Sequence, residues 1–145
     1  MPDCAVDVLL NYVDKKSLSN DVSRKTIDWM MSDKLAYLVC ENAFFIEKYA
    51  LGVLNFAAPI KASDDLMGLW VEDDARRCMW PSITCEGGSV VKLGLDSSEL
   101  TGSIPPEIAL LSNLVEYIPY NNSLTGFIPS EIGSLTKMER LSLGK

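Results

Sequence analysis

Hydrophobic positions recur at a fixed interval in the C-terminal half of the chain. Residues 91–114 and residues 115–138 align without a gap, and nine of their 24 positions are identical. A third copy begins at Glu139 and reaches Lys145. A repeat of this period predicts similar structural units stacked in a row. The matched pairs include Leu100 with Leu124, Gly102 with Gly126, Pro105 with Pro129, Ile108 with Ile132 and Leu111 with Leu135.

Each unit carries the pattern of a short strand followed by a turn. The alternation in residues 93–95 is typical of a strand with two side chains directed inward. Polar residues follow at 96–98 and 120–122, where Asn and Asp side chains replace missing main-chain partners in a turn. Gly102 relieves crowding, and Pro105 fixes the chain direction. The apolar residues expected to face a common interior are Leu100, Ile104, Ile108 and Leu111.

No single unit can bury that apolar face by itself. Stacking the units in register buries it, so the pattern predicts an α/β solenoid, a right-handed superhelix with short parallel strands on one curved face. The copy that starts at Glu139 ends while a strand is forming, and three or more repeats are normally needed for stability. We therefore expect a fragment or a shortened relative of a longer repeat protein.

The N-terminal half is typical of helices rather than repeats. Residues 1–40 contain two amphipathic segments, one near Leu9 and one near Ile27, with a break at residues 17–20. No chemistry is evident in them. We interpret this part as a helical N-terminal extension of unknown role.

A longer helix and a cysteine-bearing segment follow in residues 41–89. Apolar residues recur at helical spacing between residues 45 and 57, and Glu47 and Lys48 are expected on the other side of that helix. Residues 63–89 contain Trp, Cys and turn residues, as expected for a unit that closes the open end of a solenoid. The predicted organisation is an extension at 1–40, an N-terminal cap at 41–89 and repeats at 90–145.

Composition narrows the classes of function. The chain has 145 residues, about one domain, with 13 Lys and Arg against 20 Asp and Glu, a net charge of −7 and no basic block. Phosphate binding needs clustered cations, so nucleic acid and anionic membranes are not expected partners. The chain contains no histidine, which removes the commonest general base and most nucleophile pairs. No glycine-rich phosphate loop is present, and neither a kinase nor another enzyme is predicted.

Targeting and metal signals are equally sparse. The longest apolar stretch, residues 35–60, contains Glu41, Glu47 and Lys48, too much charge for a bilayer span. No cationic start followed by a long apolar region predicts a signal peptide. The cysteines lack the close spacing of a four-cysteine metal site, so no metal and no cofactor is expected.

The motifs of the repeats resemble a known family. Leu93-x-Leu95 followed by Leu100-x-Gly102-x-Ile104-Pro105, and again residues 124–129, closely resemble the plant-type leucine-rich repeat with its LxGxIP hallmark. The preceding helix, Trp70 and the Cys78-x-Trp80 and Cys85 signature resemble the N-terminal cap domain of that family. The resemblance covers about residues 41–145. Members include ectodomains of receptor-like kinases, receptor-like proteins and polygalacturonase-inhibitor-like wall proteins.

The resemblance carries structural implications. It implies a cap disulfide between Cys78 and Cys85, and hence an oxidising compartment and an extracellular or cell-surface location. Two reduced thiols are the alternative, while Cys4 and Cys40 have no obvious motif. The sequence departs from the family at Ser98, where the consensus asparagine that bridges repeats is absent. Asn122 fits that position in the second unit.

Outward strand positions are the candidate ligand-binding residues. The period places them in columns: Lys92, Glu116 and Arg140; then Gly94, Ile118 and Ser142; then Asp96, Tyr120 and Gly144. The alternating charges of the first column attract one another, so an exposed ion-pair ladder is favoured over a ligand contact. An outward Ile118 beside Tyr120 is a candidate anchor, although scattered surface hydrophobic residues are also normal. Pro119 takes an inward position and weakens the strand pairing there.

Two further features have simple alternatives. Asn121 begins an N-x-S acceptor for glycosylation and is also counted among the ligand-binding residues, but an asparagine is ordinary in a turn. The pairs 64–65 and 73–74 are aspartates that could bind calcium or act in catalysis, but a solvated loop is favoured. Trp70 and Trp80 are expected in the core of the cap.

The predicted function is recognition of a protein, a peptide or a cell-wall polysaccharide by the strand face, as part of a receptor-like ectodomain. A polygalacturonase-inhibitor-like protein that binds a wall-degrading enzyme is one alternative. The other is a structural fragment that self-associates through the open strand at residues 138–143.

Overall fold

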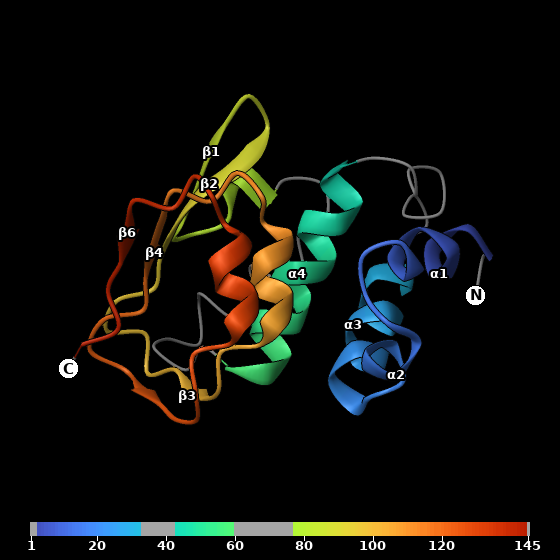
Figure 1. Ribbon diagram of the computed structural model, residues 1–145, viewed down its shortest axis with the longest axis horizontal. Coiled ribbons are helices and arrows are strands. Elements are labelled where there is room, and N and C mark those ends of the chain that lie inside the picture. Colours follow the sequence, from blue (N-terminus) through green and yellow to red (C-terminus); the bar gives the residue numbers. More distant parts are fainter. Residues whose placement is uncertain (1–2, 33–42, 60–76, 145) are drawn as a thin grey trace.

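The computed structural model describes residues 3–32, 43–59 and 77–144. The helices are α1 (Asp3–Leu10), α2 (Lys15–Leu18), α3 (Asp21–Ser32) and α4 (Ala43–Ala57), with short 3-10 helices η2 (Arg77–Met79), η3 (Pro106–Leu110) and η4 (Ser130–Ser134). The strands are β1 (Ile83–Glu86), β2 (Ser89–Gly94), β3 (Thr101–Gly102), β4 (Glu116–Ile118), β5 (Ser123–Leu124) and β6 (Arg140–Leu141). The view in Figure 1 places α4 between the N-terminal helices and the repeats.

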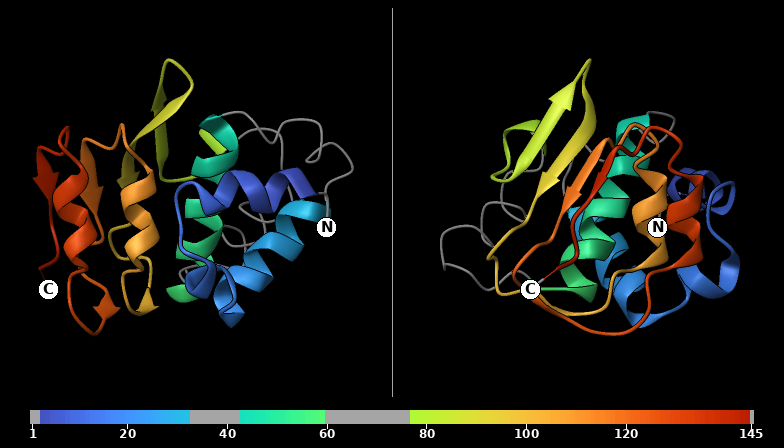
Figure 2. Two further views of the ribbon diagram at one scale, coloured as in Figure 1. Left: turned by 45° about the vertical axis from the view of Figure 1, so that its right-hand side comes forward. Right: turned by 60° about the vertical axis from the view of Figure 1, so that its left-hand side comes forward.

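The main sheet has the order β1-β2-β4-β6. β1 and β2 form an antiparallel hairpin, whereas β2, β4 and β6 run parallel to one another. The smaller sheet pairs β3 with β5, also in parallel. Each parallel neighbour lies one sequence repeat further along the chain, so the period of 24 residues is the period of the stack. The helices α4, η3 and η4 stand in a row on the side away from the main sheet (Figure 2).

The first unit folds as its pattern predicts. The two apolar residues of the strand segment, Leu93 and Leu95, are buried, and the four residues expected to face the interior are buried too: Leu100, Ile104, Ile108 and Leu111. Gly102 has a φ of +82°, and a Cβ there would lie 2.3 Å from the carbonyl oxygen of Ala57. The glycine therefore lets the first repeat approach the end of α4. Pro105, with a φ of −77°, directly precedes η3, where a fixed φ suits the start of a helical turn.

The N-terminal helices have local reasons to form. Asp14 caps α2, because its side chain accepts hydrogen bonds from the main-chain N–H groups of Lys16 and Ser17. Asn20 accepts one from the N–H of Ser23 at the start of α3 in the same way. The predicted break at residues 17–20 is therefore partly wrong: the end of α2 lies inside it, and the turn between α2 and α3 is shorter than expected.

The N-terminal helices pack on the outer side of α4. A cluster of buried residues joins them: Leu9, Ile27, Met30, Phe45, Ile46, Tyr49 and Val53. Gly52 allows the close contact, because a Cβ there would lie 2.7 Å from both Thr26 and the ring of Trp29. The Trp29 ring centroid in turn lies 6.0 Å from that of Trp80. A second cluster runs from α4 through β2 into the repeats, so α4 contributes to both cores.

The position expected for Glu47 is wrong. Glu47 does not lie apart from the apolar side of α4; it is only 4% exposed. Its carboxylate accepts hydrogen bonds from Arg77 at 2.8 and 2.9 Å and from the main-chain N–H of Val90 at 3.2 Å. Arg77 also donates to the carbonyl oxygen of Gly88. Two sides of α4 are covered, one by α3 and one by the repeats, so the residue pattern of one helix alone does not reveal this buried ion pair.

Candidate functional site: the outward face of the parallel strands

The charged column forms as predicted. Lys92 pairs with Glu116 and Glu116 with Arg140 across the parallel strands. The Lys92 Nζ atom lies 2.9 Å from Oε2 of Glu116, and an Arg140 guanidinium nitrogen lies 3.4 Å from the same oxygen. One carboxylate therefore holds two cations, and the column has a surplus of positive charge.

The electrostatics of Glu116 follow from this arrangement. The hydrogen bond from Lys92 is the main cause that holds the pKa of Glu116 below its ordinary value, and the positive charge of Arg140 adds to it. All three side chains remain in contact with solvent, with Arg140 the most exposed. Exposed pairs of this kind add little to stability, so the cations are available to a ligand at small cost.

An apolar patch lies beside the charged column. Gly94 is in register with Ile118, and a Cβ on Gly94 would meet no atom closer than 3.9 Å. Ile118 is half-buried, whereas Tyr120 is 46% exposed. The absent side chain at Gly94 leaves the outer side of Ile118 open. The structure thus brings together an aliphatic and an aromatic side chain next to two cations.

The remaining outward positions continue the columns toward the chain end. The main-chain N–H of Ser142 donates to the carbonyl oxygen of Tyr117, which places Ser142 beside β4. A Cβ on Gly144 would lie 3.6 Å from the Tyr120 ring. Asp96 is exposed and precedes Ser97, whose N–H donates to the carbonyl oxygen of Tyr120.

Asn121 lies exposed at the border of this face. Its main chain has a φ of +54°, which asparagine tolerates better than most residues, and its side-chain nitrogen donates to Oγ of Ser97 at 3.0 Å. Ser97 was not among the predicted residues of the face. The repeat spacing was the signal that could have found it, because Ser97 and Asn121 are 24 residues apart.

Asn122 joins the two units, as its position predicts. Its side-chain oxygen accepts hydrogen bonds from the main-chain N–H groups of Ser98, at 3.0 Å, and Leu100, at 2.8 Å. Its nitrogen donates to the carbonyl oxygens of Leu95 and Pro119 at 2.7 and 2.9 Å. The shorter Ser98 only donates to the carbonyl oxygen of Asp96 within its own unit. Asn122 is a structural residue of the face rather than a ligand contact.

The cysteine pair of the cap is bonded. Cys78 and Cys85 form a disulfide with an S–S distance of 2.08 Å and Cα atoms 5.5 Å apart. Trp80, between them in sequence, is buried as predicted. The aspartates at 64–65 and 73–74, Trp70 and Cys40 lie outside the described residues, as does the side chain of Cys4. Within the described ranges, no three Asp, Glu, Cys or His residues are grouped to hold a metal ion.

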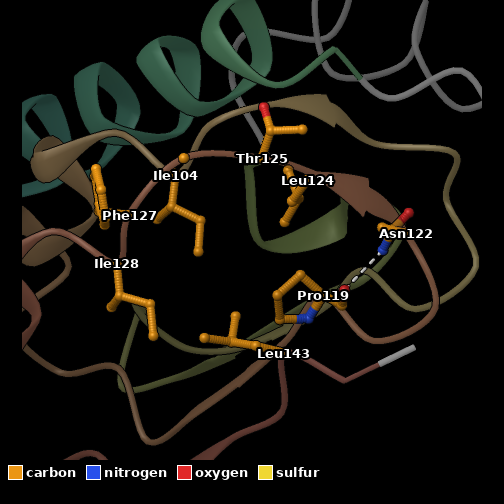
Figure 3. Close-up of a pocket in the computed structure, with 9 residues that line it drawn as sticks. Ile104, Pro119, Asn122, Leu124, Thr125, Phe127, Ile128 and Leu143 are labelled. Atoms are coloured by element: carbon orange, nitrogen blue, oxygen red, sulfur yellow. Dashed lines mark hydrogen bonds between the residues drawn. The ribbon is translucent and has the colours of Figure 1, made fainter.

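The last complete unit ends in an apolar hollow of about 220 Å³. Ile104, Leu124 and Leu143 point toward its interior, and Pro119 closes one side (Figure 3). This hollow is the interior of the solenoid seen from its C-terminal end. Pro119 is buried, which confirms its predicted inward position.

A stack of repeats with one outward parallel-strand face defines the class as a repeat solenoid. In sequence, the chain is 33% identical over 78 residues to the receptor-like protein kinase HSL1 and 32% identical over 103 residues to the protein MALE DISCOVERER 1, both of Arabidopsis thaliana. These matches cover 52% and 70% of the chain but only 8% and 15% of the relatives. No family model matches the chain.

Solved structures give the same answer. The ectodomain of the plant membrane receptor kinase GASSHO1/SCHENGEN3 from Arabidopsis thaliana, in complex with CASPARIAN STRIP INTEGRITY FACTOR 2, matches 70% of this chain with 30% identity and a TM-score of 0.56. That match covers 12% of the ectodomain chain. The ectodomain of the receptor kinase SOBIR1, also from Arabidopsis thaliana, matches 65% of this chain and 50% of its own with 29% identity and a TM-score of 0.50. The repeats are therefore leucine-rich repeats of the plant type.

Membrane crossing has one relevant finding. In residues 3–32, 43–59 and 77–144, no helix is long and apolar enough to span a bilayer.

Proposed function

We propose that this chain is a non-catalytic recognition module that binds a peptide or protein ligand on the outward face of β2, β4 and β6. The observation that carries the proposal is the conjunction of two cations, Lys92 and Arg140, with the adjoining Ile118 and Tyr120 on one regular face. The likeness to a receptor ectodomain solved in complex with CASPARIAN STRIP INTEGRITY FACTOR 2 supports a ligand of the peptide class. The proposed contact residues are Lys92, Gly94, Asp96, Glu116, Ile118, Tyr120, Asn121, Arg140 and Ser142.

The chemistry of the face suits such a ligand. Tyrosine supplies a large contact area at low conformational cost and commonly anchors interfaces. Lys92 and Arg140 share one carboxylate, so an acidic group of a ligand can pair with either cation without leaving Glu116 unpaired. The open space beside Gly94 lets a ligand side chain contact Ile118. Binding then combines an apolar anchor with charge pairing.

The proposal has a structural and a cellular part. It includes a right-handed superhelix closed by a helical cap at residues 41–89, preceded by an extension at 1–40 and followed by repeats at 90–145. It places the protein outside the cell or at its surface, in line with the ectodomains it resembles, with a glycan on Asn121. The disulfide between Cys78 and Cys85 supports an oxidising compartment.

The test uses peptides selected from a random displayed library against the folded chain. We expect Tyr120→Ala to weaken their binding by roughly tenfold or more, as for an anchor residue. Tyr12→Ala is the matched control, since Tyr12 is an exposed tyrosine in the turn after α1, outside the strand face. Equal binding by the Tyr120→Ala variant, or loss of binding in the Tyr12→Ala variant alone, contradicts the proposed face.

A self-associating scaffold is the second candidate, and one observation favours it. Ile128 is 55% exposed at the open end, and Leu141 on the last described strand is also exposed. An open strand edge with apolar neighbours can pair with another copy. Sedimentation velocity across a hundredfold concentration range tests it: a dimer abolished by Leu141→Lys supports the scaffold, and a monomer throughout rejects it.

A further inference from the structure

A second hollow lies on the helical side of the molecule, away from the strand face. It has a volume of about 350 Å³ and is formed by the turn between α1 and α2 together with η3 and η4. Figure 2 shows these helical elements side by side. Its walls include Tyr12, Asp14, Pro106, Glu107, Leu110 and Glu131. Three carboxylates therefore border one hollow in a chain where exposed acids are otherwise spread out.

Glu107 is the unusual member of this group. It is only 7% exposed, yet in the described part of the chain it makes no ion pair and no hydrogen bond with another residue's side chain. Burial raises the pKa of Glu107, its own main-chain N–H opposes that shift, and the charges of Glu131 and Asp14 raise the pKa further. Both of these neighbours line the hollow, so the Glu107 carboxylate faces into it. A buried carboxylate without a cation is costly unless a ligand supplies one.

The other two acids are differently placed. Asp14 already accepts hydrogen bonds from the N–H groups of Lys16 and Ser17 while it caps α2. Glu131 occupies the position of Glu107 one repeat later and is exposed, with a hydrogen bond from the Ser130 hydroxyl. The described carboxylates are not grouped to hold a metal ion. The spacing suits a larger, organic cation instead.

The apolar part of the wall defines the rest of that cation. Pro106, Leu110 and Val13 line the hollow beside the carboxylates. A methylene stem can lie along such residues while its charged end reaches the acids. The exposed ring of Tyr12 adds an aromatic face that attracts a cation.

We infer that this hollow binds an alkylammonium or guanidinium group, with Glu107 as the principal anion and the apolar wall as the seat for the aliphatic stem. Two sources carry this chemistry: a free polyamine, or a lysine or arginine side chain of a bound peptide. The site is separate from the strand face, so it does not depend on the proposed recognition of a ligand there.

The test is calorimetry at low salt with two probes, spermidine and the N-acetylated, amidated tripeptide glycyl-lysyl-glycine. We expect saturable binding of at least one probe, weakened by roughly tenfold in Glu107→Gln because a charge-assisted hydrogen bond is lost. Glu107→Gln removes a buried charge and leaves a similar volume, so the variant is expected to fold, and circular dichroism checks this. Glu131→Gln is a second variant with the same expected direction.

Glu139→Gln is the matched control, because it removes one exposed negative charge outside the hollow. Binding of spermidine alone assigns a free polyamine, and binding of the tripeptide assigns a lysine side chain. The inference is overturned if neither probe binds, or if Glu139→Gln weakens binding as much as Glu107→Gln, since general attraction to an acidic chain then explains the result. Library peptides at the strand face are expected to bind the Glu107→Gln variant normally, so the two proposals can fail independently.

Discussion

Equivalent residues of the two complete units differ strongly in burial although their motifs match. Ile104 is 8% exposed, whereas Ile128 is 55% exposed. Leu100 is fully buried, and its counterpart Leu124 is only partly buried. The first unit lies between α4 and the second unit, while the second has only the short segment around β6 beyond it. Burial in this fold is therefore set by what stacks on a unit as much as by the unit's own sequence.

The two ends of the stack show the same contrast. At the N-terminal end, Gly102 touches the last turn of α4, and α3 packs on the other side of that helix. At the C-terminal end, the apolar hollow beside Leu124 and Leu143 is open. One end is closed by helices and a buried ion pair, and the other presents the interior of the solenoid.

The largest expected effect breaks the closed end. Glu47→Ala leaves the guanidinium of Arg77 buried without its anion, which costs about 3–5 kcal/mol of unfolding free energy. Urea unfolding followed by tryptophan fluorescence measures it. Glu86→Ala, at an exposed position of β1, is the control and is expected to stay within about 0.5 kcal/mol of the parent chain. A small effect of Glu47→Ala means that the ion pair does not hold the cap to the hairpin.

The next test compares the two units directly. Leu100→Ala removes a fully buried side chain and is expected to cost about 2–5 kcal/mol, whereas Leu124→Ala is expected to cost less than half as much. Appending one more copy of residues 115–138 in register should raise the cost of Leu124→Ala toward that of Leu100→Ala. Equal costs in the original chain contradict the argument from stacking.

Removal of the link between the units has a smaller effect. Asn122→Ala leaves the N–H groups of Ser98 and Leu100 without their acceptor, at an expected cost of about 1–3 kcal/mol. Asn121→Ala loses one exposed hydrogen bond and should change stability by less than about 0.5 kcal/mol. Chemical denaturation of the two variants side by side distinguishes them. Similar losses in both are incompatible with a special role for Asn122.

Two buried tyrosines sharpen the comparison of the two cores. Tyr117 OH, in the core of the repeats, has no hydrogen-bond partner among the described residues, while Tyr49 OH on α4 donates to Ser23 Oγ at 3.0 Å. Tyr117→Phe is therefore expected to be neutral or to stabilise by up to about 1 kcal/mol, and Tyr49→Phe to destabilise by about 1 kcal/mol. Thermal unfolding gives both signs, and a destabilised Tyr117→Phe indicates a partner for its hydroxyl.

The smallest effect concerns the charged column and depends on pH. The pKa of Glu116 is lowered by Lys92 and Arg140, so its contribution to stability is complete above the ordinary carboxyl pKa and is lost as pH falls through the lowered value. The stability difference between the parent chain and Glu116→Gln should therefore vanish below about pH 4. Urea midpoints between pH 7 and pH 3 measure it, and a difference that grows on acidification contradicts the ladder.

The sequence predicted the features that the repeat period governs. The column of Lys92, Glu116 and Arg140, the inward leucines and the bridge at Asn122 follow from a translation by 24 residues, because stacking repeats the same geometry. The surface partner Ser97 follows from the same translation and was nonetheless overlooked.

Other features depend on contacts between segments that are not related by the repeat. The packing of Ile27 and Met30 on Tyr49 and Val53 joins two helices with no shared pattern, so the sequence predicted the helices but not their contact. Glu47 was misplaced for the same reason, since its partner Arg77 lies 30 residues away. Glu107 was overlooked because its burial arises from the turn after α1.

Amide hydrogen exchange with and without a library-selected peptide tests the central claim most directly. If the outward strand face is the recognition surface, protection on binding is expected in residues 115–121 and 139–144. Protection confined to η3, η4 and the turn between α1 and α2, with the strands unchanged, would contradict recognition by the strand face.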